Sequence, residues 1–569
     1  MTISGLSLVA FLALQATPPP QTGTGVIQGR VLQAGGTRAI EDAAITLTTA
    51  PVGGGVRGGP RGGAPVEEAP PRVAVSDKEG NFEFRDLPPG RYTAVAQRRG
   101  FSGPSVNSPP PSVGVSVANG QTARAEIFMT PTGVVRGRVR DASGQFASNV
   151  QVEALVIAYR NGLASLMPAI SKASDDRGEY RLFGLPPGDY YIGATPRPPS
   201  AIVARAGGDR SVKTFHPNAF DVSQAKRIII HGGEDIQNID IAIQTPQMFK
   251  ISGTVSTTVP VAAPPPAAQG AFAVIQQNYN ATVQLILSSR DLEKPEGGNS
   301  GGTSVSVTGT APGPFQIQNV LPGSYDLVAV FNGNSETPAL ARTVVDIRNQ
   351  DVGGIVMTIR EGFVITGSAT IDGKAPPQDG DREAFGIVFR PADGLRRIGI
   401  GLPANFEPDG SFKIPGAPDG RFRLAVLPFG PDIYVDDIRQ AGVSIFDSGF
   451  EIRGRNPEPI QVLIKSGAGS LEGTLQDASG KLLTGGVVAL VPATRRENDA
   501  LYFTARSDPS GNFVIRGIAP GNYKLFSWDV MPPSAQYNAA FLEKYEERGV
   551  PITIAAGAKL TSKVTAIPR

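Results

Sequence analysis

His231 and Glu234 are the residues of this chain that come closest to a catalytic metal site. They form H-x-x-E, a spacing that can place an imidazole and a carboxylate on one zinc ion. A zinc site needs a third protein ligand, and the chain's other histidine, His216, lies upstream of the motif. The letters HGGE are also typical of a hairpin turn. We therefore expect no zinc catalysis.

Two glycine-rich motifs could form a nucleophile or a phosphate site. Residues 298–302 satisfy G-x-S-x-G around Ser300, but a nucleophile elbow needs a strand before it, a helix after it and a histidine base. Here the motif lies in the polar loop EGGNSGGTS, and no histidine follows it. Residues 53–58 match G-x-G-x-x-G, yet no helix follows that could present its amides to a phosphate. The overlapping RGGPRGG resembles an RNA-binding segment, but a solvated loop explains it better.

The acidic residues and the cysteine count restrict the chemistry further. The pairs Asp175 and Asp176, and Asp436 and Asp437, could bind calcium, but the sequence around them supplies too few oxygen ligands. The absence of cysteine excludes disulfides, thiolate metal sites and cysteine nucleophiles. No catalytic-sized region is left for a pair of glycosidase carboxylates. The sequence therefore predicts a protein that is not an enzyme and that has no cofactor or metal.

Carbohydrate binding makes smaller demands, because an exposed aromatic ring can stack on the apolar face of a pyranose. In the stretch NYKLFSWD, Tyr523 faces one side of the expected strand, and Phe526 and Trp528 face the opposite, outward side. Tyr537 and Tyr545 could extend this aromatic surface, so these last four residues are the candidate ligand contacts. The alternative is that Trp528, the single tryptophan, anchors a nearby helix. We favour the anchor for Trp528 itself.

The elements that would position these residues are visible as repeats. One stretch occurs five times, each copy with two glycines ten residues apart and an aromatic residue two positions after each glycine. The copies are GNFEFRDLPPGRY from Gly80, GEYRLFGLPPGDY from Gly178, GPFQIQNVLPGSY from Gly313, GSFKIPGAPDGRF from Gly410 and GNFVIRGIAPGNY from Gly511. Catalytic groups rarely occur in five copies at one spacing, whereas core residues do. We therefore expect the repeated aromatic residues to lie in hydrophobic cores.

A second motif opens each unit. GVIQGRV, GVVRGRV, FKISGTV, FVITGSA and GSLEGTL centre on Gly29, Gly137, Gly253, Gly367 and Gly473. Apolar residues two before and two after each glycine predict a strand with one buried face. A glycine on that face leaves room for a close approach or marks a bulge. Turns such as SDKEG, and the LPPG that interrupts pairing, complete a pattern of about seven strands per unit, which predicts a β-sandwich.

Together these motifs resemble the carboxypeptidase regulatory-like domain. The shared pattern is G-x-V-x-D-x-x-G followed by D-x-x-G-x-F-x-F-x-x-L-P-P-G-x-Y, and the first, second and fifth units match it best. The third and fourth units depart from it, since TAPGPF and EPDGSF replace the Asp turn. The resemblance covers residues 25–569 and implies transthyretin-like sandwiches, a fold related to carbohydrate-binding-like folds. It implies the regulatory appendage of a carboxypeptidase, without the catalytic part.

The predicted fold is therefore all-β, a tandem array of about five seven-stranded transthyretin-like β-sandwich modules. The predicted boundaries are a signal peptide at 1–16, module 1 at 25–131, module 2 at 132–247, module 3 at 248–361, module 4 at 362–466 and module 5 at 467–569. Gly/Pro-rich loops are expected at 51–71 in module 1 and at 259–271 in module 3. Module 5 should contain a short helix near 538–548 that ends at Gly549.

The first residues predict export. ISGLSLVAFLAL is too short to cross a bilayer but suits a signal-peptide core, with cleavage after Ala16, although no Lys or Arg precedes it. We expect no transmembrane span and a secreted, periplasmic or cell-surface location. A net charge of +2 gives no field that would draw the whole protein to nucleic acid.

These features predict an exported, non-enzymatic binding or scaffold protein of the cell envelope. Polysaccharide is the first expected ligand class, and envelope proteins are the second. The alternative functions are protein–protein adhesion and a purely structural spacer. A more remote alternative is an accessory regulatory subunit of a carboxypeptidase-like hydrolase.

Overall fold

The computed structural model shows a chain built almost entirely of β-strands. It describes residues 24–49, 71–106, 108, 110–160, 162–196, 212–259, 283–290, 303–307, 313–331, 339–376, 386–392, 403–426, 430–508 and 510–568. The chain divides into two compact units: Met1–Gly103 with Pro109–Pro131, and Pro104–Ser108 with Thr132–Arg569. The described residues include no helix that is both long enough and apolar enough to cross a lipid bilayer.

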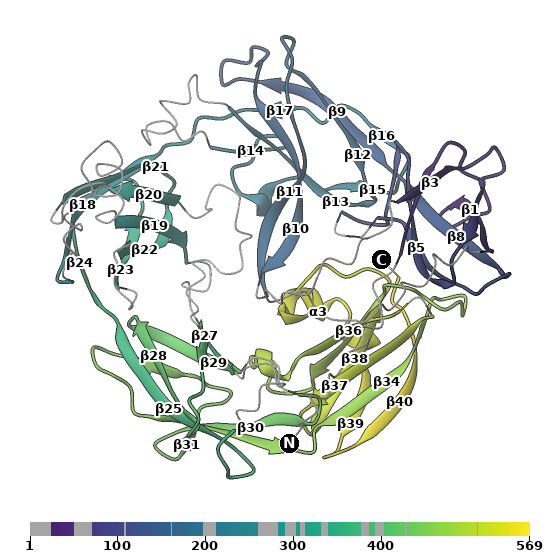
Figure 1. The fold of residues 1–569 in the computed structure, drawn as a ribbon. Coiled ribbons are helices and arrows are strands. Elements are labelled where there is room, and N and C mark those ends of the chain that lie inside the picture. The colour runs from purple at the N-terminus through teal and green to yellow at the C-terminus, as the bar shows by residue number, and fades with distance from the viewer. Residues whose placement is uncertain are drawn as a thin grey trace, which may run out of the picture. The chain divides into compact units, whose positions relative to one another are not determined.

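Module 1 is a two-layered β-sandwich (Figure 1). One sheet has the strand order β4-β1-β8-β6 and the other β3-β2-β5-β7. Their facing sides enclose a core that includes Ile27, Val31, Phe82 and Tyr92. The strands are β1 (Gly25–Gln33), β2 (Ala44–Thr49), β3 (Arg72–Val75), β4 (Asn81–Leu87), β5 (Gly90–Gln97), β6 (Phe101–Ser102), β7 (Ser112–Val117) and β8 (Thr122–Pro131).

Module 2 also has two sheets. One has the order β11-β10-β13-β14 with β15 on β13, and the other has β12-β9-β16 with β17 on β9. Val135, Val139, Tyr180 and Tyr190 are part of the core. Its elements are β9 (Gly133–Arg140), β10 (Gln151–Arg160), β11 (Leu163–Ala173), β12 (Glu179–Leu185), β13 (Gly188–Thr195), β14 (Thr214–Phe215), η1 (Val222–Gln224), β15 (Ile228–Ile230), β16 (Asp235–Ile236) and β17 (Ile241–Ala242).

Module 3 joins all its described strands in one seven-stranded sheet of order β20-β19-β22-β23-β24-β18-β21. The sheet is continuous because β23 pairs with β24 at Ala339–Glu361 and Leu340–Arg360. The strands are β18 (Phe249–Thr257), β19 (Val283–Ser289), β20 (Thr303–Val307), β21 (Gly313–Val320), β22 (Gly323–Phe331), β23 (Ala339–Ile347) and β24 (Val352–Glu361).

Modules 4 and 5 each have two sheets among the described residues. Their orders are β28-β25-β33-β30-β31 and β27-β26-β29-β32 in module 4, and β37-β34-β40 and β36-β35-β38-β39 in module 5. Module 4 contains β25 (Phe363–Ile371), β26 (Gly386–Pro391), β27 (Pro403–Asn405), β28 (Ser411–Ala417), β29 (Gly420–Val426), β30 (Ile433–Gln440), β31 (Val443–Ser444), β32 (Phe450–Ile452) and β33 (Ile460–Ser466). Module 5 contains β34 (Gly469–Gln476), β35 (Val487–Pro492), η3 (Asp499–Leu501), β36 (Phe503–Arg506), β37 (Asn512–Ile518), β38 (Gly521–Trp528), η4 (Ala535–Tyr537), α3 (Ala539–Glu543), η5 (Glu546–Arg548), β39 (Val550–Ile554) and β40 (Lys559–Thr565).

The same strand pairing occurs in all five predicted ranges. The strand that carries the motif opening each unit pairs antiparallel with the strand of the aromatic motif: β1 with β4, β9 with β12, β18 with β21, β25 with β28 and β34 with β37. It pairs in parallel with a strand near the end of the same range: β8, β16, β24, β33 and β40 respectively. A fold of several β-sandwiches follows from these pairings, while the individual boundaries stay predictions.

The two sequence motifs meet as direct cross-strand partners. The pairs are Gly29 with Phe82, Gly137 with Tyr180, Gly253 with Phe315, Gly367 with Phe412 and Gly473 with Phe513. A Cβ at Gly29 would lie 2.3 Å from the Phe82 ring, and a Cβ at Gly473 would lie 1.8 Å from the carbonyl oxygen of Ser562 on the parallel neighbour. The glycine thus permits a close approach, and the register shifts of the β1–β4 and β34–β37 pairs occur at the beginning of β1 and β34, not at this glycine. In modules 1, 4 and 5 the rings of Phe82, Phe412 and Phe513 fill the space that the glycine leaves.

The second aromatic residue of the repeat stabilises the LPPG turn through a hydrogen bond. The Tyr92 hydroxyl donates to the carbonyl oxygen of Pro88 at 2.7 Å, and Tyr523 donates to Ala519 at 2.8 Å. Tyr190 and Tyr325 make the same contact four residues back. Module 4 has a phenylalanine, Phe422, at this position and therefore lacks the hydrogen bond. These residues lie in hydrophobic cores, as their repetition predicts, and the tyrosines also stabilise the turn, which the sequence does not predict.

Candidate functional site

The four predicted ligand contacts gather around the outer face of β38. Tyr523 points into the core between the two sheets of module 5, whereas Phe526 and Trp528 point to the other side. The predicted alternation along NYKLFSWD is therefore confirmed. We name the outward group the outer aromatic cluster; its aromatic members are Tyr159, Tyr502, Phe526, Trp528, Tyr537, Phe541 and Tyr545.

The rings of the outer aromatic cluster pack on one another. Trp528 stacks on Phe526 with a centroid separation of 5.6 Å and an interplanar angle of 10°. Phe541 and Tyr545 close over Trp528 at centroid distances of 5.8 Å and 5.7 Å. Trp528 and Phe526 are each 1% exposed, so neither offers a free face to a sugar. Their burial agrees with the anchor alternative, and a platform here would require the covering segment to move.

The covering segment is less helical than the sequence predicts. In place of one helix near 538–548, the structure has the five-residue α3, flanked by the single turns η4 and η5. Asn538 caps α3, because its side-chain oxygen accepts a hydrogen bond from the amide of Phe541 at 2.9 Å. Gly549 has an extended backbone with φ −73° and is no left-handed stop. Its glycine is explained by packing, since a Cβ there would lie 2.6 Å from the Phe526 ring.

Glu546 connects this covering segment to the sheet through hydrogen bonds. Its carboxylate accepts hydrogen bonds from both Nη1 and Nη2 of Arg496 at 2.8 Å, and from the Lys524 ammonium at 2.6 Å. The hydroxyl of Tyr502 donates to the carbonyl oxygen of Arg496 at 2.7 Å, which fixes the loop that carries the arginine. Hydrogen bonds from Arg496 and then from Lys524 lower the pKa of Glu546 from 4.5 to about 2, against the opposing effect of burial.

This pKa predicts an acid-sensitive cover. Because the folded pKa lies below the unfolded one, the stabilisation by Glu546 is complete above pH 4.5 and is lost as the pH falls toward 2. Wild type and Glu546→Gln should therefore differ in stability at pH 6, and the difference should shrink across this window. Trp528 emission during denaturation measures it. A stability difference between wild type and Glu546→Gln that stays constant down to pH 2 would contradict this explanation.

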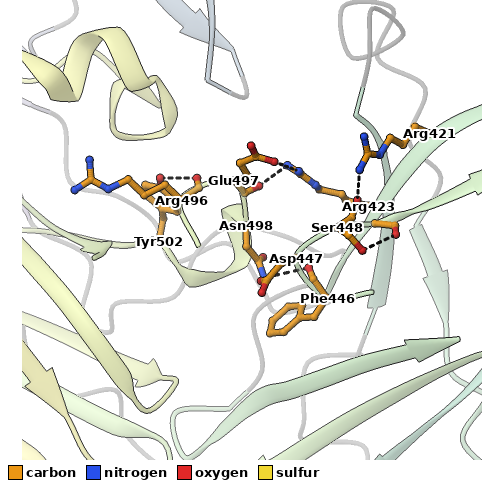
Figure 2. Close-up of polar contacts among 10 residues, drawn as sticks. Arg421, Arg423, Phe446, Asp447, Ser448, Arg496, Glu497, Asn498 and Tyr502 are labelled. Carbon is orange, nitrogen blue, oxygen red and sulfur yellow. Dashed lines mark hydrogen bonds and ion pairs between the residues drawn. The ribbon is translucent and has the colours of Figure 1, made fainter. Parts of the chain in front are cut away.

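A polar network joins modules 4 and 5 (Figure 2). Arg423 on β29 donates from Nη2 to the Glu497 carboxylate at 2.6 Å. The amide of Asn498, which is 4% exposed, donates to the carbonyl oxygen of Phe446 at 3.1 Å and to the Asp447 carboxylate at 2.9 Å. Leu501 and Ala519 of module 5 also belong to the apolar cluster of module 4. This junction is thus both polar and apolar, and no local sequence pattern indicates it.

A hairpin of module 2 contacts the covering segment of module 5. The tip between β10 and β11 presents the carbonyl oxygen of Gly162, which accepts a hydrogen bond from the Asn538 side chain at 2.9 Å. Tyr159 lies edge-on to Phe541, with ring centroids 5.8 Å apart. Gly162 has φ +77°, and a Cβ there would lie 2.9 Å from the Cβ of Tyr537, so the contact requires a glycine. Non-neighbouring modules therefore meet at the outer aromatic cluster.

The other candidates from the sequence are not brought together into one site. Within the described ranges, no three His, Cys, Asp or Glu side chains are grouped as a metal site would need. The amide of His231 donates to the Glu234 carboxylate at 3.0 Å, so the motif forms a local turn contact. Asp175 caps its own turn, and Asp436 pairs with Lys465 at 2.9 Å. Ser300, residues 53–58, residues 1–16 and most of the two predicted loops lie outside the described residues.

Residues 26–130 match the carboxypeptidase regulatory-like domain. No curated protein matches the chain. Among solved structures, the minor pilin GBS52 of Streptococcus agalactiae is 14% identical over 39% of this chain and 97% of its own, with a TM-score of 0.20. The full-length major pilin RrgB of Streptococcus pneumoniae is 8% identical over 96% of this chain and 100% of its own, with a TM-score of 0.17. Matches at these scores support no inference about function.

Proposed function

We propose, from the premise that residues 26–130 are a carboxypeptidase regulatory-like domain, that the chain is an exported array of five such sandwiches. Its role is structural and protein-binding, at the cell envelope. The extension beyond residue 130 is supported by the glycine–aromatic pair and the parallel strand pairing that recur in modules 2–5. Export rests on the apolar run that precedes Thr17.

The observation that carries the structural role is that polar and aromatic residues form contacts between modules. Arg423, Glu497 and Asn498 connect modules 4 and 5, and Gly162 meets Asn538 across 376 positions of sequence. A protein that presents binding surfaces at fixed relative positions needs such junctions, because freely jointed domains would not keep those surfaces in fixed positions. Trp528 and Phe526 are buried. A role as an adhesive or spacer protein is therefore favoured over sugar binding at these two residues.

The proposal is tested by fractionation and sedimentation. Protein recovered from the periplasm or medium should have a new amino terminus near residues 15–22 by mass spectrometry. The purified mature chain should sediment with isolated cell envelopes and leave peptide and glycoside substrates uncleaved. Recovery of the intact Met1 form from the cytoplasm alone, or a chain that stays in the supernatant of the envelope assay, would contradict it.

A further inference from the structure

We propose that the outer face of the sheet β12-β9-β16 in module 2 binds a polyanionic polysaccharide. β9 carries Arg136, Arg138 and Arg140 at alternate positions, all exposed, while Val135 and Val139 on the opposite face of the strand are fully buried. The strand therefore points three guanidinium groups to one side, about 7 Å apart along the strand. In this sheet β9 lies between β12 and β16, and β17 also pairs with β9.

Further cationic side chains lie beside this row of arginines. Arg181 on β12 is the cross-strand partner of Arg136. Lys172, at the end of β11, lies with its ammonium 5.3 Å from the centre of the Phe183 ring. Phe183 is itself the cross-strand partner of Val134, so it lies at the end of the face where β9 begins. The face thus combines four arginines and a lysine.

Two exposed aromatic rings border the row. Phe146, 45% exposed, bridges to Arg140 and is stacked by the guanidinium groups of Arg140 at 4.4 Å and Arg138 at 5.5 Å. Phe183 is 39% exposed and has Arg181 at 5.7 Å. A guanidinium group that rests on a ring is held in place and is weakly hydrated, so it gives up little freedom or water when it pairs with a carboxylate or sulfate.

Local carboxylates neutralise only part of this charge. Asp235 pairs with Arg136, and Glu179 pairs with Arg138 at 2.7 Å. Both pairs are roughly half exposed and therefore exchange partners at small cost. Among the described residues, no carboxylate forms an ion pair with Arg140, Arg181 or Lys172. The face keeps an excess of positive charge in a chain whose net charge is only +2.

The sibling modules show that folding does not require this row. The three positions correspond to Gln28, Arg30 and Leu32 in module 1, Ser252, Thr254 and Ser256 in module 3, Thr366, Ser368 and Thr370 in module 4, and Glu472, Thr474 and Gln476 in module 5. Each of these strands makes the same antiparallel and parallel pairs without three arginines. The arginines of module 2 are thus a surface property that the fold leaves free to vary.

A polysaccharide that bears carboxylates or sulfates fits this face. A straight row of cations suits an extended polymer with repeated anionic groups, and exposed rings suit the apolar faces of sugar units. Nucleic acid would satisfy the charges equally well, and the choice of polysaccharide over it rests on the proposed export. Module 2 alone supplies the face, which is independent of the contacts of module 5.

The test uses the full mature chain and four probes of similar length: polygalacturonate, neutral dextran, single-stranded DNA and polyglutamate. Polygalacturonate should bind most tightly, and its affinity should fall with added salt. Arg138→Thr/Arg140→Ser introduces the residues of module 3 and should weaken this binding by at least about tenfold. Lys559→Ser/Lys563→Thr removes the same charge from β40 and should stay within about twofold.

Melting curves accompany each variant, and Phe146→Ala provides a second disruption of the same face should the double variant not fold. Equal loss in both double variants, equal binding of dextran, or tighter binding of DNA or polyglutamate would overturn the proposal. Envelope sedimentation with no polygalacturonate binding would overturn this inference and leave the proposed function standing. Polygalacturonate binding by a chain that is never exported would overturn the proposed function and leave this inference standing.

Discussion

Phe82→Ala should lower the free energy of unfolding of module 1 by about 3–5 kcal/mol. Phe82 is 5% exposed, packs edge-on against Phe84 with centroids 6.0 Å apart, and covers Gly29 across the strand pair. Truncation removes buried apolar surface and leaves a cavity over a glycine, which has no side chain to fill it. Because module 1 belongs to its own compact unit, the loss should remain local to it.

Hydrogen exchange followed by mass spectrometry measures this effect in the intact chain. Amides in residues 24–49 and 71–102 should exchange faster in the variant, while peptides from modules 2–5 should keep their wild-type rates. Val73→Ala, at a side chain that is 64% exposed on β3, is the matched control and should leave all rates nearly unchanged. If Phe82→Ala behaved like this control, the glycine–aromatic register would be wrong.

Trp528→Ala should have a similarly large effect on module 5, about 3–5 kcal/mol. The indole is 1% exposed and contacts Phe526, Phe541 and Tyr545, so its removal takes away the centre of the outer aromatic cluster. The segment of η4, α3 and η5 would then keep the hydrogen bonds of Glu546 to the sheet but lose its main apolar contact, which is the Trp528 ring. We expect it to detach before the sandwich core of module 5 unfolds.

Circular dichroism and calorimetry on the full chain measure the loss of stability. Leu482→Ala, at a side chain that is 51% exposed in the same module, is the control and should change the melting temperature little. The platform alternative predicts another pattern for Trp528→Ala: polysaccharide binding would fall while the melting temperature stayed at the wild-type value. That pattern would contradict the anchor.

The local periodicity of the sequence predicts the strands and indicates which face of each strand is buried. Alternation alone indicated that Tyr523 and Phe526 lie on opposite faces of β38, as the structure confirms. The sequence predicts that the five glycines lie on the buried faces of their strands and that the aromatic residues lie in cores, but it does not predict that the two are cross-strand neighbours. Register between strands such as β1 and β4 depends on turns and on packing, which no single segment encodes.

The contacts between modules could not be predicted, because their residues follow no local pattern. Arg423 and Glu497 resemble ordinary surface charges, and Gly162 resembles an ordinary turn glycine. The helix of module 5 shows how tertiary contacts override a local preference. NAAFLEKYEERG has helical spacing, yet Tyr545 leaves the helical region with φ −118° and ψ 4°, which lets its ring meet Trp528 and lets Glu546 reach Arg496.

The emission of Trp528 in the unmodified protein tests most directly whether the aromatic residues of module 5 are structural. The chain has one tryptophan, so its fluorescence reports the outer aromatic cluster alone. A buried Trp528 should have blue-shifted emission that acrylamide quenches weakly, that neutral polysaccharide leaves unchanged, and that shifts to the red only on denaturation. Emission typical of a solvent-exposed indole, strongly quenched by acrylamide and protected by neutral polysaccharide, would contradict this prediction.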